Sequence, residues 1–196
     1  VQTWTGVTGL RGRPLLVLTL AWLLGRLLLA LGAGLPLWVV MAGDLLFLIL
    51  ATIAMAYPVF KAKQRKNMIF VPILAILALL NGVSHWGVVT NQPELAQFSL
   101  HGAIMMFVLI IAILGGRVIP FFTANGAGVD KKPPMKWLEI VSIASIVVLV
   151  AIAFVGFNKV PSNLLLTVSS IAAIANGWRF LRWNGQHCAR IPLLWS

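Results

Sequence analysis

Apolar residues fill six long stretches of this chain, and polar residues are concentrated between them. A run of about 20 apolar residues is long enough to cross a bilayer as one helix. The apolar positions run around whole helices, which lipid tolerates and water does not. The pattern therefore predicts an all-α fold, a single transmembrane domain of about six helices, with spans near 14–34, 35–60, 68–89, 98–119, 137–157 and 164–183. The sixth span is the most polar of them.

The connections between these spans alternate sharply in charge. When the six spans are threaded back and forth, thirteen of the fifteen Lys and Arg residues fall on one side, Lys159 falls on the other, and Arg26 lies inside the first span. Short cytoplasmic loops carry the Lys and Arg excess in membrane proteins. We therefore expect the basic loops, with Arg179 among their residues, to be cytoplasmic and to contact lipid headgroups.

The amino-acid composition is typical of a membrane protein, and it affects how the net charge is interpreted. The chain is 60% hydrophobic and 10% charged, far from a soluble average of roughly 45–50% and 25%. A net charge of +11 in a soluble domain would suggest nucleic acid. Here the basic residues follow the membrane topology, so we expect the lipid bilayer, and not nucleic acid, as their partner. The single cysteine, Cys188, excludes an internal disulfide.

The fourth span ends in an unusual segment of small and basic residues. Pro120 is expected to end this helix, and the loop 121–136 to follow it. The pair Gly115 and Gly116 would let a neighbouring helix approach closely. Arg117 stands where its stem can lie in hydrocarbon while its head reaches the surface, which predicts an interfacial anchor.

Two histidines are predicted near the outer ends of adjacent spans. His85 lies late in the third span and His101 early in the fourth, each about one helical turn below the surface, and the loop between them is short. They could ligate one metal or two, or simply bond to a carbonyl or to water. Met105 lies on the His101 face of the helix, and a thioether suits copper(I) or haem iron, although Met is also a common core residue. His187, beside Cys188, is expected on the surface.

A second polar group joins the first two spans. Arg26 and Asp44 are predicted at similar depth beneath the same outer turn. A lone charge in hydrocarbon costs about 2.5–3.5 kcal/mol or more, so we expect them to form a structural ion pair. The functional alternatives are a contact from Arg26 to haem propionates and a proton relay through Asp44. Asn81, one turn before His85, could orient that imidazole.

Two motifs resemble those of a known family. Trp4-Thr5-Gly6 with Leu20-Ala21-Trp22-Leu23-Leu24-Gly25-Arg26, followed later by the string GGRVIPFFTAN at 115–125, resembles the NnrS family, membrane proteins of denitrifying and related bacteria. The resemblance implies a multi-pass inner-membrane protein with haem, copper or both, which acts in the response to nitric oxide and nitrosative stress. It implies His85, His101, Arg26 and Arg117 as cofactor-binding residues, and His85, His101 and Met105 as metal ligands.

The family pattern also implies that the chain is an internal piece of a longer protein. Its relatives carry about twice as many helices, with His-rich portions before and after. Those missing N- and C-terminal parts are then expected partners, as are nitric oxide or iron-nitrosyl species. The alternatives are a transporter or channel fragment for an ion or small anion without a cofactor, and a purely structural half. The sequence leaves catalytic activity open, and no hydrolase or kinase motif is present.

Overall fold

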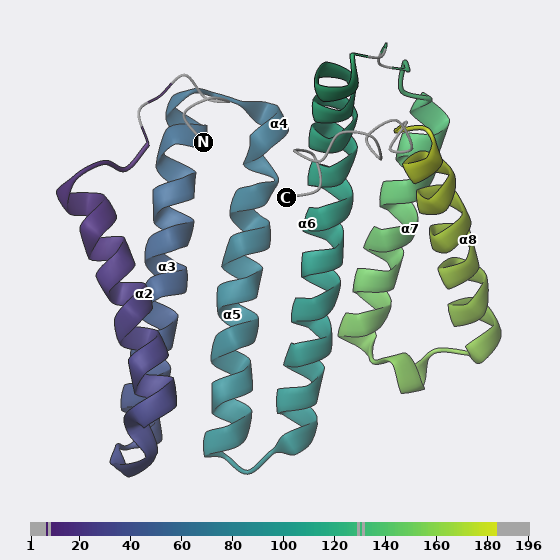
Figure 1. Cartoon of the computed structure of the whole chain (residues 1–196). Helices are drawn as coiled ribbons and strands as arrows, with labels where there is room; N and C mark the ends of the chain where they lie inside the picture. Colours follow the sequence, from purple (N-terminus) through teal and green to yellow (C-terminus); the bar gives the residue numbers. More distant parts are fainter. Residues whose placement is uncertain (1–6, 8, 129, 131, 184–196) are drawn as a thin grey trace. The chain divides into compact units, whose positions relative to one another are not determined.

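The structure is a computed structural model that describes residues 7, 9–128, 130 and 132–183. Among these residues it contains helices and turns and no strand. The helices are α2 (Arg13–Leu31), η1 (Gly32–Gly34), α3 (Leu37–Lys61), α4 (Arg65–Met68), α5 (Phe70–Val89), α6 (Pro93–Ala127), α7 (Lys136–Val155), η2 (Phe157–Lys159) and α8 (Ser162–Leu181) (Figure 1).

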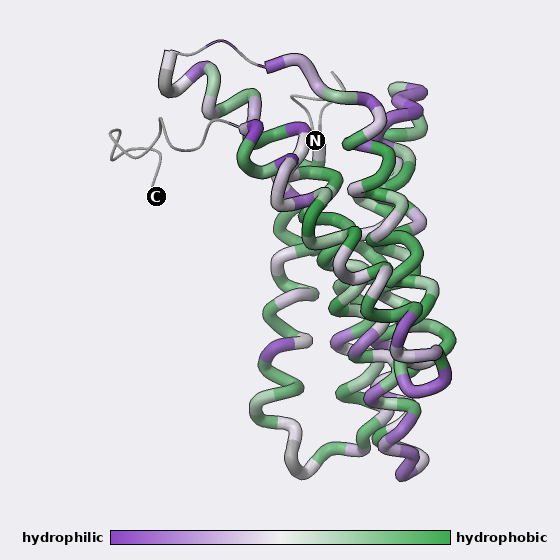
Figure 2. The backbone as a smooth tube through the Cα atoms, turned by 90° about the vertical axis from the view of Figure 1, so that its right-hand side faces the viewer, coloured by the Kyte–Doolittle hydropathy of each residue, from purple (hydrophilic) through white to green (hydrophobic). Residues whose placement is uncertain are grey.

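Six of these helices are long and apolar enough to span a membrane, which confirms the predicted fold class. The α4 turn leads directly into α5, and together they make one candidate span. Figure 2 shows hydrophobic residues along most of each helix, with hydrophilic residues gathered mainly near the helix ends. The chain is therefore a multi-pass membrane protein.

Prolines mark where several of the helices begin. Pro14 lies in the first turn of α2, Pro93 opens α6, and Pro36 and Pro161 precede the first residues of α3 and α8. Proline suits these positions because its fixed φ is helical and its missing N–H has no partner there anyway. At the other end of α7, Gly156 has a φ of 105°, a conformation that favours glycine.

Pro120 does not end its helix, so that prediction was wrong. Helix α6 continues through Pro120 to Ala127, and the expected loop therefore begins later. Proline removes one backbone hydrogen bond, the one to the carbonyl of Gly116. Membrane helices tolerate such a loss because neighbouring turns and helices compensate for it.

The chain divides into two compact units, Val1–Ala103 and Ile104–Ser196, with the division inside α6. In the first unit α3 packs against both α2 and α5. The α2–α3 contact is very close at Gly25, where an added Cβ would lie 3.1 Å from the backbone oxygen of Gly43. In the second unit α7 packs against α8. Each unit holds one cluster of charged residues in its interior.

Candidate functional site

The first unit is organised around a buried carboxylate. Asp44 lies in the second turn of α3, and only 4% of the residue is exposed. An ionised carboxylate is costly to bury unless it is paired and hydrogen-bonded. The surrounding helices provide those partners.

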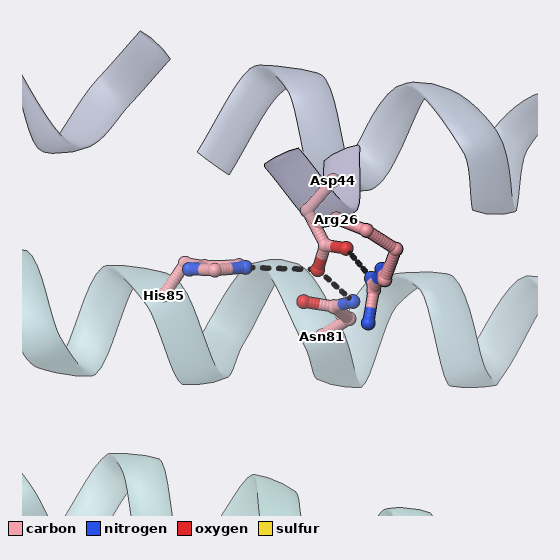
Figure 3. Close-up of polar contacts among 4 residues, drawn as sticks. All are labelled: Arg26, Asp44, Asn81 and His85. Carbon is pink, nitrogen blue, oxygen red and sulfur yellow. Dashed lines mark hydrogen bonds and ion pairs between the residues drawn. The ribbon is translucent and has the colours of Figure 1, made fainter. Parts of the chain in front are cut away.

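Three side chains from two other helices converge on Asp44 (Figure 3). Arg26 of α2 forms an ion pair with Oδ1. Asn81 of α5 donates from Nδ2 to Oδ2 at 2.8 Å. His85, one turn further along α5, places Nε2 3.1 Å from the same Oδ2. We call these four residues the Asp44 cluster.

The arrangement indicates which ring nitrogen of His85 carries a hydrogen toward Asp44. A carboxylate paired with Arg26 only accepts hydrogen bonds, so the contact at 3.1 Å requires a hydrogen on Nε2 of His85. In the neutral imidazole the other nitrogen, Nδ1, then carries the lone pair. This is the arrangement seen behind metal-ligating histidines, where a carboxylate fixes the tautomer and the ring. The cluster thus presents one oriented nitrogen base.

Two glycines allow the cluster to form. An added Cβ at Gly25 would lie 3.2 Å from the Cα of Asp44, and one at Gly43 would lie 2.3 Å from Cδ1 of Leu28. Small residues of this kind let membrane helices approach closely. The close approach of α2 to α3 brings the Arg26 side chain within reach of Asp44.

The structure brings together Arg26 and Asp44, which were expected at similar depth, and adds His85, which was not expected to contact Asp44. It also assigns Asn81 a different role. We expected Asn81 to orient the imidazole of His85. Its amide instead bonds to the carboxylate of Asp44, so it positions the group that in turn holds His85. The sequence could not show this, because it depends on α3 lying against that face of α5.

The other predicted ligands lie on α6. Because α6 begins at Pro93, His101 follows its first residue by eight positions, about 12 Å or two turns in. His85 precedes the end of α5 by four residues, about 6 Å. His101 therefore lies further from the end of its helix than His85 does. His101 is exposed, Met105 is half-buried, and Arg117 is exposed.

The described residues can offer a metal or haem individual ligands, but they do not enclose it. Among residues 7, 9–128, 130 and 132–183 no group of three or more His, Cys, Asp or Glu side chains could enclose a metal ion. His85 with Asp44 behind it can nevertheless supply one imidazole ligand, and haem iron needs only one or two axial ligands from protein. His187 and Cys188 lie outside the described residues.

A second cluster, in the other unit, was missed by the sequence analysis. Arg179 of α8 donates from Nε to Oε1 of Glu139 at 2.9 Å and from Nη2 to Oε2 of the same carboxylate. Its Nη1 donates to the carbonyl of Ala112 in α6 at 2.8 Å. Its guanidinium also lies 5.7 Å from the ring centre of Trp183. Arg179 therefore links the three helices of the second unit.

The buried position of Arg179 corrects its expected role as a headgroup contact. Only 4% of the residue is exposed, so it lies inside the unit. The pair could have been predicted by comparing how far each residue lies from its helix end. Glu139 lies three residues after the start of α7, and Arg179 lies two residues before the end of α8. Adjacent antiparallel helices place those positions at the same level.

This cluster explains one glycine of the 115–125 segment. An added Cβ at Gly116 would lie 1.7 Å from Nη2 and 2.3 Å from Cζ of Arg179. The glycine is thus needed so that a guanidinium, and not only a helix backbone, can lie against α6. Gly115 is less crowded, with a Cβ 3.3 Å from Cη2 of Trp183.

Comparison with known proteins identifies the family. The family model described as NnrS protein matches residues 1–196, which is the whole chain. Searches of curated proteins and of solved structures gave no significant match. The match includes the segment that carries Gly116 and the helices that carry both charged clusters. The six membrane helices and this match together show that the chain belongs to the NnrS family.

Proposed function

We propose that the protein acts in the response to nitric oxide as a membrane metalloprotein, and that His85 is one of the ligands to haem iron or copper. The observation that carries this proposal is the contact of His85 Nε2 with Asp44 Oδ2 at 3.1 Å. A carboxylate in that position fixes the orientation of the imidazole, as carboxylates do behind metal-ligating histidines. Family membership supports the choice of haem or copper.

The residues of the cluster have distinct parts in this proposal. His85 offers Nδ1, Asp44 holds the ring, and Arg26 and Asn81 hold Asp44. Haem iron or copper would supply the capacity to bind nitric oxide. Any remaining ligands come from outside the cluster, and His101 with Met105 on α6 are the candidates within the described residues. Arg117 serves as the interfacial anchor of α6.

The proposal includes an orientation. Arg26, Asp44 and His85 all lie near the ends of their helices that are opposite the basic loops. If those loops are cytoplasmic, as charge bias in bacterial inner-membrane proteins favours, the Asp44 cluster lies in the outer half of the membrane. Nitric oxide produced outside the cytoplasm would then reach the metal without crossing the whole bilayer.

Transport of an ion or small anion is less well supported. Transporter sites near the middle of the membrane are typically built from interrupted helices. Helices α2, α3 and α5 run without interruption through the residues of the Asp44 cluster. The buried carboxylate is therefore better explained as a support for His85.

The test is the visible absorption spectrum, reduced minus oxidised, of the purified full-length protein, together with its iron and copper content. We expect His85→Ala to abolish or shift a haem band, or to remove copper, while circular dichroism shows that the helices remain. His101→Ala is the matched variant, with the same change on the next span. An unchanged spectrum and an unchanged metal content in His85→Ala would refute the proposal.

A further inference from the structure

Arg26 and Arg179 both lie within apolar helices and both pair with a carboxylate, but they differ in how fully their donors are used. The side chain of Arg179 is 5% exposed, and each of its three nitrogens donates a hydrogen bond. The side chain of Arg26 is 47% exposed and donates through Nη2 alone, to Asp44. Among the described residues Asp44 is the partner of Arg26. The N–H groups on Nε and Nη1 of Arg26 therefore face its surroundings.

Those surroundings are apolar. The neighbours of Arg26 along α2 include Leu23, Leu24 and Leu27, all exposed on a helix of which little is buried. Polar hydrogens that face hydrocarbon without an acceptor are strongly disfavoured. The backbone of α2 cannot move away from α3 here, because the adjacent Gly25 packs against the backbone of Gly43 and Asp44. Only the flexible side chain of Arg26 can bring its donors to a polar partner.

Asp44 accepts a hydrogen bond from only one nitrogen of Arg26 in this structure. Its Oδ2 already accepts hydrogen bonds from Asn81 and His85, which leaves Oδ1 for Arg26. A guanidinium can present two parallel N–H groups to one carboxylate or phosphate, as Arg179 does with Glu139. Arg26, in contrast, contacts its carboxylate through one nitrogen, so the donors on its Nε and Nη1 are not used by Asp44.

We propose that Arg26 binds an oxyanion, a phosphate or a carboxylate, on the side of its guanidinium that faces away from Asp44. Arg26 precedes the end of α2 by five residues, about 8 Å, and a long side chain at this depth can reach the headgroup layer. The oxyanion is then a phospholipid headgroup or a small anion from solution. The proposal does not depend on a metal at His85.

The experiment uses the full-length protein in a mild detergent, with phosphatidylglycerol as the probe and native mass spectrometry as the readout. Arg26→Gln with Asp44→Asn removes both charges together, so that neither is left buried alone. Arg26→Lys keeps a charge beside Asp44 and loses the forked geometry. Arg13→Gln, which removes an exposed charge from the first turn of the same helix, is the matched control. Inorganic phosphate, added without lipid and followed by thermal unfolding, tests the other source.

We expect the double variant to bind phosphatidylglycerol about tenfold more weakly or worse, as loss of a charge-assisted pair implies. Arg26→Lys is expected to lie between it and the wild type. Arg13→Gln removes only one of the many headgroup contacts of the basic loops, so it is expected to bind far more tightly than the double variant does. Protection by phosphate that the double variant lacks, with lipid binding unchanged, would support the site and identify a soluble anion as its ligand. Equal binding of both probes by every variant would overturn the proposal, and so would an equal loss in Arg13→Gln.

Discussion

Glu139 and Arg179 are joined by two hydrogen bonds between α7 and α8, and the third nitrogen of Arg179 bonds to a carbonyl of α6. Buried ion pairs of this kind add little net stability over apolar packing, but breaking one strands a buried charge. Replacing one residue of this pair is therefore expected to lower stability far more than replacing both.

Glu139→Gln is expected to destabilise the protein by about 3 kcal/mol, because Arg179 loses its counter-charge while it stays buried. Glu139→Gln with Arg179→Met is expected to recover much of this loss. Glu94→Gln, which changes an exposed acid at the start of α6, is the control. The measurement is the free energy of unfolding from detergent titration followed by circular dichroism. A double variant that is no more stable than Glu139→Gln alone would contradict this account.

Gly116→Ala is expected to cost several kcal/mol, because the new methyl group would occupy the position of the Arg179 guanidinium, which Glu139 and Ala112 hold in place. Gly177→Ala in α8 provides the matched control, since an added Cβ there meets nothing within 4 Å. That change is expected to be neutral or to stabilise α8 by up to about 1 kcal/mol. Thermal unfolding of the two variants side by side would show the difference, and equal melting temperatures would disprove the steric role of Gly116.

Substitution by alanine is expected to change the free energy of unfolding in opposite directions at Ser142 and at Ser145 of α7. The hydroxyl of Ser142 is fully buried and has no hydrogen-bond partner among the described residues, whereas Ser145 donates to the carbonyl of Ser142 at 3.1 Å. Removing an unsatisfied buried polar group relieves its desolvation cost. We expect Ser142→Ala to raise the free energy of unfolding by up to about 1 kcal/mol, and Ser145→Ala to lower it by a similar amount. A lower stability of Ser142→Ala would indicate that its hydroxyl has a partner, such as a bound water molecule.

Asp44→Asn is expected to destabilise the first unit by about 1–3 kcal/mol, because an amide can accept hydrogen bonds from one side only while Arg26, Asn81 and His85 all donate. Asp130→Asn makes the same change at an exposed acid and is expected to stay within about 0.5 kcal/mol of the wild type. Chemical unfolding of the two variants distinguishes them. If both behave alike, the Asp44 cluster does not hold α2, α3 and α5 together.

The sequence was sufficient for the six spans and for the depth at which Arg26 meets Asp44, because both follow from counting residues along apolar runs. The prediction that proline ends the fourth helix was wrong at Pro120. The flanking turns of α6 compensate for the one backbone hydrogen bond that proline removes. The prediction was also wrong at Glu139 and Arg179, because basic residues near span ends were all assigned to the surface. The sequence does not show which face of a helix packs against which neighbour. Asn81 illustrates this, because its amide bonds to Asp44 on α3 and not to the imidazole of His85.

The length of α6 has a consequence for the lipid that suits this protein. With 35 residues, α6 extends for about 52 Å, well beyond a hydrocarbon core of about 30 Å. Helices α2, α7 and α8 have 19 or 20 residues, so they match that core with no excess. In a thicker bilayer these three helices would be shorter than the hydrocarbon core, whereas α6 would still span it. The short helices, and not the long one, determine the range of membrane thickness in which the protein is stable.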